Sequence, residues 1–365
     1  MLSDILLPLC SIFFWRKKML NIYDKNGYLN IENILKTKLT FLFVVGGRGI
    51  GKTFGALKYV VERNIKFVFL RRTQSQVDLI NKQEFSPMTP IANYLHMDIV
   101  SVPLSKYNVG FYKAITNDEG KLSPVGECLG YSMALSTVSN LRGFSADDVQ
   151  LIIFDEFIPE RHERPIKEEA AALFNCYETI NRNRELDGRP PVQLLCLANS
   201  NDAGNPIFTE LKLISKVENM KKKGQVYSLD YNRGIGIFMP DNSSISRAKK
   251  ETALYKLTSG SDFEQMALAN EFDDFRWQDN IRSMPLKELK PLCSVGELCF
   301  YKHKSQNIYY CTTAMMSAPD EYHATDKDLK RFRRKHGYLW LAYLRNLMLF
   351  EDATSEIIFN KYMNM

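Results

Sequence analysis

The chain has 365 residues, of which 45% are hydrophobic and 25% charged, and its formal net charge is +6. This length and composition exclude a disordered or fibrous protein and leave room for two domains with separate hydrophobic cores. The mild positive charge is compatible with a polyanionic partner but does not identify one. The 7 cysteines form no CxxC pair and no His/Cys cluster with metal-ligand spacing, so we expect reduced thiols in a cytosolic protein.

An apolar run near the N-terminus, residues 6–15, is followed by Arg16, Lys17 and Lys18. About ten apolar residues are too few to span a bilayer, and the charges follow the run, whereas in a signal peptide they precede it. We therefore expect residues 1–18 to be an extension that is dispensable or docks a partner, without contact to a membrane. Met19 is an alternative start of the protein, because the first apolar strand-like run begins only at residue 39.

The strongest motif is G-G-R-G-I-G-K-T, directly behind the apolar run 39–45. It fits the P-loop pattern G-x-x-x-x-G-K-[ST] with a strand before it and a helix after it, a context that an accidental glycine-rich turn would not need. Glycines let the backbone turn so that its N–H groups face a β-phosphate, and the next helix adds its dipole. Lys52 is expected to bridge the β- and γ-phosphates, and the Thr53 hydroxyl to hold Mg²⁺. The candidate nucleotide-binding residues of this motif are Gly46, Gly47, Arg48, Gly49, Ile50, Gly51, Lys52 and Thr53.

The residues after the P-loop predict a parallel sheet. Residues 54–64 have the period of a helix, and residues 66–70 form an alternating apolar strand that ends on Arg71 and Arg72. Strand, P-loop, helix and strand make one βαβ unit, so we expect a parallel sheet covered by helices. Three short β-like runs between residues 98 and 139, separated by turn residues, predict a small antiparallel addition beside it.

A second motif, L-I-I-F-D-E at residues 151–156, is a continuous apolar run that ends in two carboxylates. Such a run is typical of a strand buried on both faces, and ligands of parallel sheets bind beyond the carboxyl ends of the strands. We expect Asp155 to hold Mg²⁺ through its water shell and Glu156 to orient and deprotonate the attacking water. The alternative is that the acidic pair caps the N-terminus of a following helix.

Residues 168–181 are helical in period and lead to Arg182 and Arg184. A solvated helix end, favoured by the helix dipole, is the plain interpretation of these arginines. The next apolar strand, residues 192–197, leads to Asn199, which we expect to sense the γ-phosphate from the tip of the strand after the acidic pair.

The second half of the chain carries no comparable motif. We divide the sequence into an extension (1–18), a P-loop domain (19–206), a linker or lid (207–283) and a second α/β unit (284–365). The last unit contains a basic run that suits phosphate-backbone binding, although a solvated helix face is the commoner fate of such runs. The run comprises Lys327, Lys330, Arg331, Arg333, Arg334 and Lys335.

The order of these motifs resembles that of the DNA-packaging ATPases of small podoviruses of the Picovirinae type, relatives of the large terminase ATPases. The similarity is specific over residues 40–205 and continues more faintly through residues 257–272 and the C-terminal unit. It implies an α/β fold, with a parallel-sheet P-loop NTPase domain of the ASCE/terminase type and a small C-terminal RNase H-like domain.

The resemblance also implies a function: ATP hydrolysis with Mg²⁺ drives double-stranded DNA into a prohead. The motor would be a homo-oligomeric ring, of five copies in the family, docked at the portal (connector) vertex. It would work in the host cytoplasm and be missing from the mature virion. In that family neighbouring subunits complete each nucleotide site, and Arg182 falls at the position of the arginine finger. Arg142 falls where the family has a second basic residue that acts in trans.

The same resemblance indicates nucleic-acid contacts. The segment after residues 71 and 72 corresponds to one that faces the DNA channel, and it departs from the family by carrying Gln74 where a lysine is expected. The C-terminal unit has few carboxylates, such as Asp320, Glu321 and Glu351, so we expect no nuclease activity, which needs a carboxylate cluster for two metal ions. Its basic run would dock the prohead, through a packaging RNA in some members. The nucleic-acid candidates are Arg71, Arg72, Gln74, Gln76, Lys82, Lys330, Arg331, Arg333, Arg334 and Lys335.

Two alternatives to a packaging motor stay open at this point. One is a large terminase with an active nuclease as well as an ATPase. The other is a nucleic-acid-binding assembly factor that is regulated by nucleotide and moves nothing.

Overall fold

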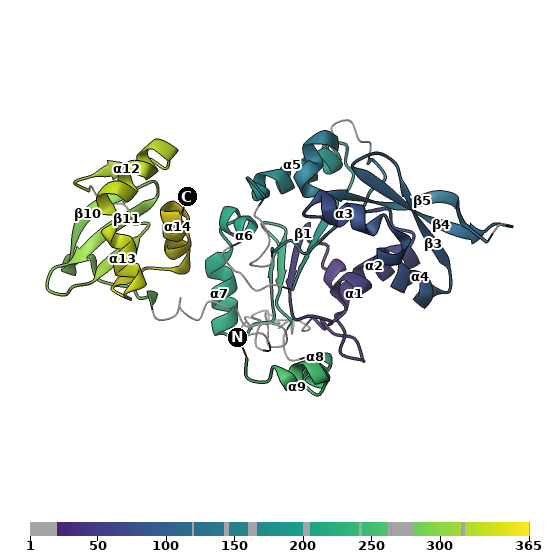
Figure 1. The fold of residues 1–365 in the computed structure, drawn as a ribbon, viewed down its shortest axis with the longest axis horizontal. Coiled ribbons are helices and arrows are strands. Elements are labelled where there is room, and N and C mark those ends of the chain that lie inside the picture. Colours follow the sequence, from purple (N-terminus) through teal and green to yellow (C-terminus); the bar gives the residue numbers. More distant parts are fainter. Residues whose placement is uncertain are drawn as a thin grey trace, which may run out of the picture.

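The computed structural model describes residues 20–118, 120–141, 146–159, 166–199, 205–240, 243–261, 264, 280–314 and 318–364. Figure 1 shows two bodies, one built on a sheet of 9 strands and the other on a sheet of 5 strands. Within the described ranges, no helix has the length and apolar character that a membrane span requires. The expected extension, residues 1–18, lies outside the described residues.

The centre of the large sheet is parallel. Its strands are β1 (Phe41–Val45), β2 (Phe67–Arg71), β6 (Leu151–Asp155) and β7 (Gln193–Ala198). They lie in the order β2-β6-β7-β1, and each adjacent pair is parallel. Their side chains are buried on both faces, which is why each strand is an almost continuous apolar run. The predicted parallel sheet is confirmed.

Alternate residues of these strands enter two cores. Phe43, Ile152 and Leu194 pack with helices α5 (Glu169–Asn181), α6 (Pro206–Glu210) and α7 (Ile214–Lys222) on one face. Leu42, Ile153 and Leu195 pack with α1 (Ile31–Leu35), α2 (Lys52–Glu62) and α4 (Thr89–Leu95) on the other. The sheet is therefore the middle layer of a three-layer α/β domain.

The predicted antiparallel addition is confirmed at one edge of this sheet. Strands β3 (Asp98–Pro103), β4 (Asn108–Thr116) and β5 (Leu122–Ala134) pair in antiparallel fashion. The end of β5, Gly130–Ala134, pairs in parallel with β2 and joins the addition to the core.

At the opposite edge the large sheet extends beyond the boundary expected at residue 206, which is a correction. Strand β9 (Ile235–Phe238) pairs in parallel with β1, and β8 (Tyr227–Asp230) pairs with β9. Without β9, the strand that leads into the P-loop would be an open edge with unpaired backbone groups. The sequence concealed this extension because β8 and β9 have only 4 residues each and carry no motif.

The remaining short elements lie on the surface of this domain or join its parts. They are α3 (Gln74–Ile80), η1 (Gln83–Phe85), η2 (Leu135–Leu141), α8 (Ser244–Lys249) and α9 (Ala253–Leu257), whereas η3 (Leu286–Glu288) leads into the sheet of the C-terminal unit. Most of residues 257–272, over which the resemblance is faint, lie outside the described residues.

The C-terminal unit is a mixed sheet with helices packed against it. Its strands are β10 (Leu289–Val295), β11 (Leu298–His303), β12 (Tyr309–Thr312), β13 (Glu321–Tyr322) and β14 (Met348–Phe350). Its helices are α12 (Asp326–His336), α13 (Tyr338–Leu344) and α14 (Ala353–Asn364). The strand order is β13-β10-β11-β12-β14. A core around Phe300, Phe332 and Phe359 joins sheet and helices, so the predicted second α/β unit is confirmed, whereas β10, β13 and β14 were not predicted.

Arg72 is part of the core of the large domain, which contradicts its prediction as a DNA contact. Its side chain is 0% exposed, and that of Glu169 on α5 is 1% exposed. Arg72 Nε donates to Glu169 Oε1 at 2.7 Å and Nη2 donates to Oε2 at 3.0 Å. This bidentate pair fastens the end of β2 to the start of α5, and a guanidinium held in this way cannot reach a DNA backbone.

We expect Arg72→Met to lower the free energy of unfolding of the large domain by about 3–5 kcal/mol, because it leaves the Glu169 carboxylate buried without its cation. The measurement is urea denaturation, with Lys82→Met as the control, because Lys82 is exposed. Equal stabilities of the two variants, together with weaker DNA binding by Arg72→Met, would return Arg72 to the nucleic-acid contacts.

Candidate nucleotide site

The predicted P-loop residues, from Gly46 to Thr53, form one loop between β1 and α2. Gly49 and Gly51 have φ angles of 77° and 86°, in the left-handed region that favours glycine. Helix α2 begins at Lys52, so its N-terminal dipole points into the loop. Backbone and helix thus provide a site that suits an anion such as a phosphate.

Lys52 lies inside this loop and is 5% exposed. Its Nζ donates to the carbonyl oxygens of Gly46 and Gly47, both at 2.7 Å. Burial lowers the pKa of Lys52 to about 7, although the carboxylate of Asp155 opposes this shift. Keeping Lys52 protonated therefore costs free energy, and the negative charge of a bound polyanion would offset this cost.

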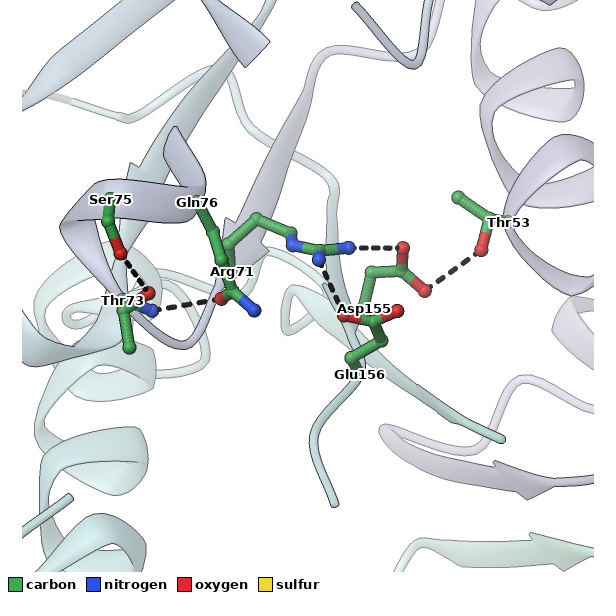
Figure 2. A network of polar contacts seen from close by, with 7 residues as sticks. All are labelled: Thr53, Arg71, Thr73, Ser75, Gln76, Asp155 and Glu156. Carbon is green, nitrogen blue, oxygen red and sulfur yellow. Dashed lines mark hydrogen bonds and ion pairs between the residues drawn. The ribbon is translucent and has the colours of Figure 1, made fainter. Parts of the chain in front are cut away.

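Thr53, the residue after the P-loop lysine, contacts the acidic pair directly. Thr53 Oγ1 donates to Asp155 Oδ1 at 2.9 Å (Figure 2). Asp155 ends β6, and its side chain is almost fully buried. A hydroxyl beside a carboxylate is a set of hard oxygen ligands, and it fits a Mg²⁺ ion that keeps several of its waters.

Arg71 joins both carboxylates of the acidic pair, a role that the sequence analysis missed. Figure 2 shows its guanidinium between them, with Nη1 2.9 Å from Asp155 Oδ2 and Nη2 2.5 Å from Glu156 Oε2. The reason is register: Leu70 pairs with Phe154 on the adjacent parallel strand, so the next residues of the two strands lie together. Arg71 is engaged by the acidic pair in this arrangement, and its contact with DNA stays a prediction. The position of Arg71 at the end of a strand is the signal in the sequence that could have indicated its place beside the acidic pair.

Glu156 has a strained backbone with φ of 57°. The N–H of the following residue, Phe157, donates to the carbonyl of Leu197 on the adjacent strand β7 at 3.1 Å. Left-handed geometry at a residue other than glycine is characteristic of functional sites. It turns the Glu156 side chain out of the strand and toward Arg71.

Asn199 follows β7, which lies between β6 and β1. Ala198 pairs with Val45, and its carbonyl accepts the Gly46 N–H at 3.2 Å. Asn199 is therefore next in the chain to a residue that touches the P-loop. Its role as the γ-phosphate sensor stays a prediction.

The two arginines after α5 differ sharply. Arg184 is 6% exposed, and its Nη2 donates to the Asp147 carbonyl at 2.7 Å, so it holds the chain in place. The Arg182 side chain is 42% exposed, with φ of 48° and an ion pair to Asp147 at 3.4 Å. Arg182 can therefore reach a second molecule, whereas Arg184 cannot. Arg142, the other residue expected to act in trans, lies outside the described residues.

Among the DNA candidates after β2, Gln76 is occupied within the chain. Its Oε1 accepts the Thr73 N–H at 3.1 Å and closes a capping box at the start of α3 (Figure 2). Gln74 donates to Asp78 Oδ1 at 2.9 Å on the same helix. Lys82 is exposed. Gln74 and Lys82 stay predicted DNA contacts, but Gln76 is better explained as a cap.

The basic run in the C-terminal unit lies on α12, and the helix separates its members. Arg333 is half-buried and donates to the Tyr362 carbonyl at 3.0 Å, and Lys335 pairs with Asp320 at 2.7 Å. The exposed residues at helical spacing, which share one face, are Lys327, Lys330, Arg331 and Arg334. The predicted single basic surface is thus corrected to this face, on which Arg331 also pairs with Asp328.

The acidic residues of the C-terminal unit are spread across its sheet. Asp320 and Glu321 lie at β13. Glu351 follows β14, and its carboxylate accepts a hydrogen bond from the Thr312 hydroxyl. Strands β13 and β14 are the two opposite edges of the sheet. These carboxylates therefore do not converge.

A family model described as the podovirus DNA encapsidation protein (Gp16) matches residues 23–280. The DNA packaging protein of Bacillus phage phi29 is 28% identical over 254 residues, which cover 68% of this chain and 67% of that protein. The DNA packaging protein of Bacillus phage B103 is 30% identical over 235 residues, or 63% of each chain.

Two solved structures share the fold over nearly the whole chain. The bacteriophage Phi-29 viral genome packaging motor assembly aligns with a TM-score of 0.63 and 22% identity, over 92% of this chain and 98% of that chain. The Phi-28 gp11 DNA packaging motor aligns with a TM-score of 0.61 and 20% identity, over 93% and 98%. At these identities the structures establish the similarity of the fold, including that of the C-terminal unit.

The low pKa of Lys52 leads to a prediction about proton uptake. Bound phosphates raise the pKa of Lys52 because negative charge favours the ammonium. At about pH 8 the protein alone has largely lost this proton, so binding of an ATP analogue takes a proton up, and affinity falls as the pH rises above about 7. The measurement is titration calorimetry in buffers that differ in ionisation enthalpy.

The control for this experiment is the same titration at about pH 6, where Lys52 is already protonated and proton uptake by this group should vanish. Binding at the higher pH without proton uptake would show that Lys52 keeps its proton in the protein alone.

Proposed function

The chain belongs to the podovirus DNA encapsidation protein (Gp16) family, and on this basis we propose that it is an ATP-hydrolysing motor subunit that drives double-stranded viral DNA into a preformed prohead. The observation that carries the proposal is the Thr53–Asp155–Arg71–Glu156 cluster. It joins the phosphate-binding loop, an oxygen site for a metal ion and a carboxylate beside them, which are the parts that hydrolysis of ATP needs.

The division of work within the site follows from the positions of the side chains. The P-loop backbone and Lys52 would bind the β- and γ-phosphates, with Asn199 close to the γ-phosphate. Thr53 and Asp155 would hold Mg²⁺, which neutralises phosphate charge when it is bound. Glu156 would orient the attacking water and accept its proton. In the structure the Glu156 carboxylate is paired with Arg71, so hydrolysis would require that this contact weaken.

The site would be completed by a second copy of the chain. The exposed guanidinium of Arg182 can approach a neighbour's γ-phosphate, and Arg142 is proposed to act in the same direction. Such an arrangement needs a closed ring, because a heterologous contact must close to give every subunit a neighbour. We propose five copies, the number that the resemblance implies. Nucleotide turnover would then be linked around the ring.

The proposed partners are DNA in the channel of the ring and the portal of the prohead at one end. Gln74 and Lys82 are the candidate DNA contacts. The exposed face of α12, with Lys327, Lys330 and Arg334, is the candidate surface for the prohead or for a packaging RNA, because cations on one face suit a phosphate backbone. The subunit would act in the host cytoplasm, transiently at the portal vertex, and would not stay in the mature virion.

We assign the C-terminal unit, from about residue 284, to docking and not to DNA cleavage. Its derivation from an RNase H-like nuclease is part of the proposal. The separation of Asp320 and Glu351 on opposite sheet edges supports a domain without nuclease activity, since two-metal cleavage needs convergent carboxylates. The large domain and the segment that follows β9 would make up the rest of the motor.

The proposal is tested by measuring ATP turnover with DNA, with and without proheads. The wild type should be stimulated most when both are present, because only a packaging motor needs both. Glu156→Gln should lower turnover at least about 100-fold, because it removes the general base, while binding of a fluorescent ATP analogue persists. Turnover that survives Glu156→Gln would remove Glu156 as the base.

Two further arms of the same assay examine the C-terminal unit. Charge reversal at Lys327, Lys330 and Arg334 should remove the part of the stimulation that depends on proheads and leave the basal rate unchanged. Supercoiled plasmid incubated with the wild type and Mn²⁺ should stay intact. Nicking of the plasmid would show an active nuclease and contradict the assignment to docking alone.

Arg182→Ala should lower turnover about 10³-fold or more, the effect of losing an arginine finger, with nucleotide binding retained. Arg189→Ala, a nearby exposed arginine, is the control. Because the finger acts on the neighbour, mixing Arg182→Ala with Glu156→Gln subunits should restore turnover, since some sites then have both an intact Glu156 and a neighbouring Arg182. Mixtures without activity would place the action of Arg182 within its own subunit.

A further inference from the structure

The carbonyl oxygens of the P-loop need hydrogen-bond donors, because buried backbone carbonyls are rarely left unpaired. Nearly all of these partners are visible in the structure. Gly46 and Gly47 accept from Lys52 Nζ, Arg48 accepts from Lys249 Nζ, Ile50 accepts from the Leu29 N–H, and Gly51 accepts from the Gly55 N–H. Two of these donors, Lys249 and Leu29, come from outside the loop and its helix.

Lys249 is the last residue of α8 and lies 201 positions from Arg48 in the sequence. Its Nζ donates to the Arg48 carbonyl at 2.9 Å, in a partly buried position. Burial and, to a smaller extent, the charge of Arg48 lower the pKa of Lys249. Holding an ammonium here therefore has a cost, which argues that the contact is more than a chance surface pair.

Gly49 leaves room for this lysine. A Cβ atom built on Gly49 would overlap Lys249 Nζ and lie 2.6 Å from its Cε. The pattern G-x-x-x-x-G-K-[ST] leaves this position open to any residue. In this chain its φ of 77° favours glycine, and the Lys249 ammonium packs against the space beside it.

The other end of α8 reaches the second outside donor. Ser244 Oγ donates to the Asn26 carbonyl at 3.2 Å, and a Cβ on Gly27 would overlap this same hydroxyl. The turn at residues 24–28 leads directly to Leu29, whose N–H donates to the Ile50 carbonyl at 2.9 Å. Helix α8 therefore contacts the P-loop directly through Lys249 and also supports the turn before Leu29.

We propose that Lys249 is a positioning residue that clamps the P-loop in its phosphate-binding shape from α8. The inference rests on the proposed nucleotide-binding role of this loop. The Arg48 carbonyl belongs to the same peptide unit as the Gly49 N–H, so a cation on the oxygen polarises the unit and strengthens the N–H as a donor to phosphate. Two P-loop peptide units, 48–49 and 50–51, are then held, by Lys249 and by Leu29, before the nucleotide arrives.

The clamp also acts in the reverse direction. If Lys249 favours nucleotide binding, then the nucleotide must stabilise the α8 contact by the same factor. Helix α8 precedes α9 and the segment that leads to the C-terminal unit. Occupancy of the P-loop thus becomes coupled to the start of the connection between the two units.

The test compares Lys249→Met with Lys250→Met in the full-length protein. Lys250 is the exposed C-cap residue that follows α8 and makes no P-loop contact among the described hydrogen bonds. A fluorescent ATP analogue should bind about tenfold more weakly to Lys249→Met, the loss of a charge-assisted hydrogen bond, while Lys250→Met binds like the wild type. At saturating ATP the turnover number should be unchanged, so the effect appears in KM, and Lys249→Arg should restore most of the affinity.

Hydrogen exchange distinguishes a clamp from a merely structural lysine. In the wild type, the ATP analogue should slow amide exchange at residues 24–29 and 244–249, and in Lys249→Met the slowing at residues 244–249 should disappear, with α12 as the unaffected reference. Equal affinities of Lys249→Met and Lys250→Met, with a wild type that binds the analogue, would overturn the inference alone. A wild type that does not bind the analogue would overturn the proposed function together with the inference.

Discussion

The parallel pairing of β2, β6, β7 and β1 is the constraint on which the site depends. Parallel strands bring their carboxyl ends to one edge, and all four of these ends lie at the edge where the cluster forms. The P-loop follows β1, Arg71 ends β2, Asp155 ends β6 and Asn199 follows β7. The strands can be buried on both faces because helices cover both sides of the sheet. The packing of the core therefore places the candidate site residues at the carboxyl ends of the parallel strands.

Charge balance then decides how the groups at this edge are arranged. The buried Lys52 ammonium satisfies its donors on loop carbonyls, and Arg71 divides its guanidinium between two carboxylates. Burial opposes the charge on Lys52 and Lys249 alike. A polyanionic ligand would favour both cations. The loop is thus organised for a ligand with several negative charges, which agrees with membership of a family of DNA encapsidation proteins.

Arg71 and Arg72 show the limit of reading the sequence alone. As neighbours after an apolar strand they look equivalent, and both suggested a basic patch. The fold gives Arg71 to the acidic pair of the adjacent strand and buries Arg72 against Glu169 on α5. Arg182 and Arg184 differ for the same reason, because one residue ends a helix at the surface and the other is tied to a backbone carbonyl. The local sequence pattern therefore does not reveal which residue each arginine pairs with.

The sequence by itself determined the P-loop, the acidic pair, the order of strands and helices around them and the existence of a second α/β unit. These features depend on residue type and short-range period, which are local properties. Only the tertiary structure decided that β9 covers β1, that Arg71 faces Glu156 and that Lys249 contacts the Arg48 carbonyl. Each of these contacts joins residues far apart in the chain or on different strands, and the packing of the sheet selects the partner.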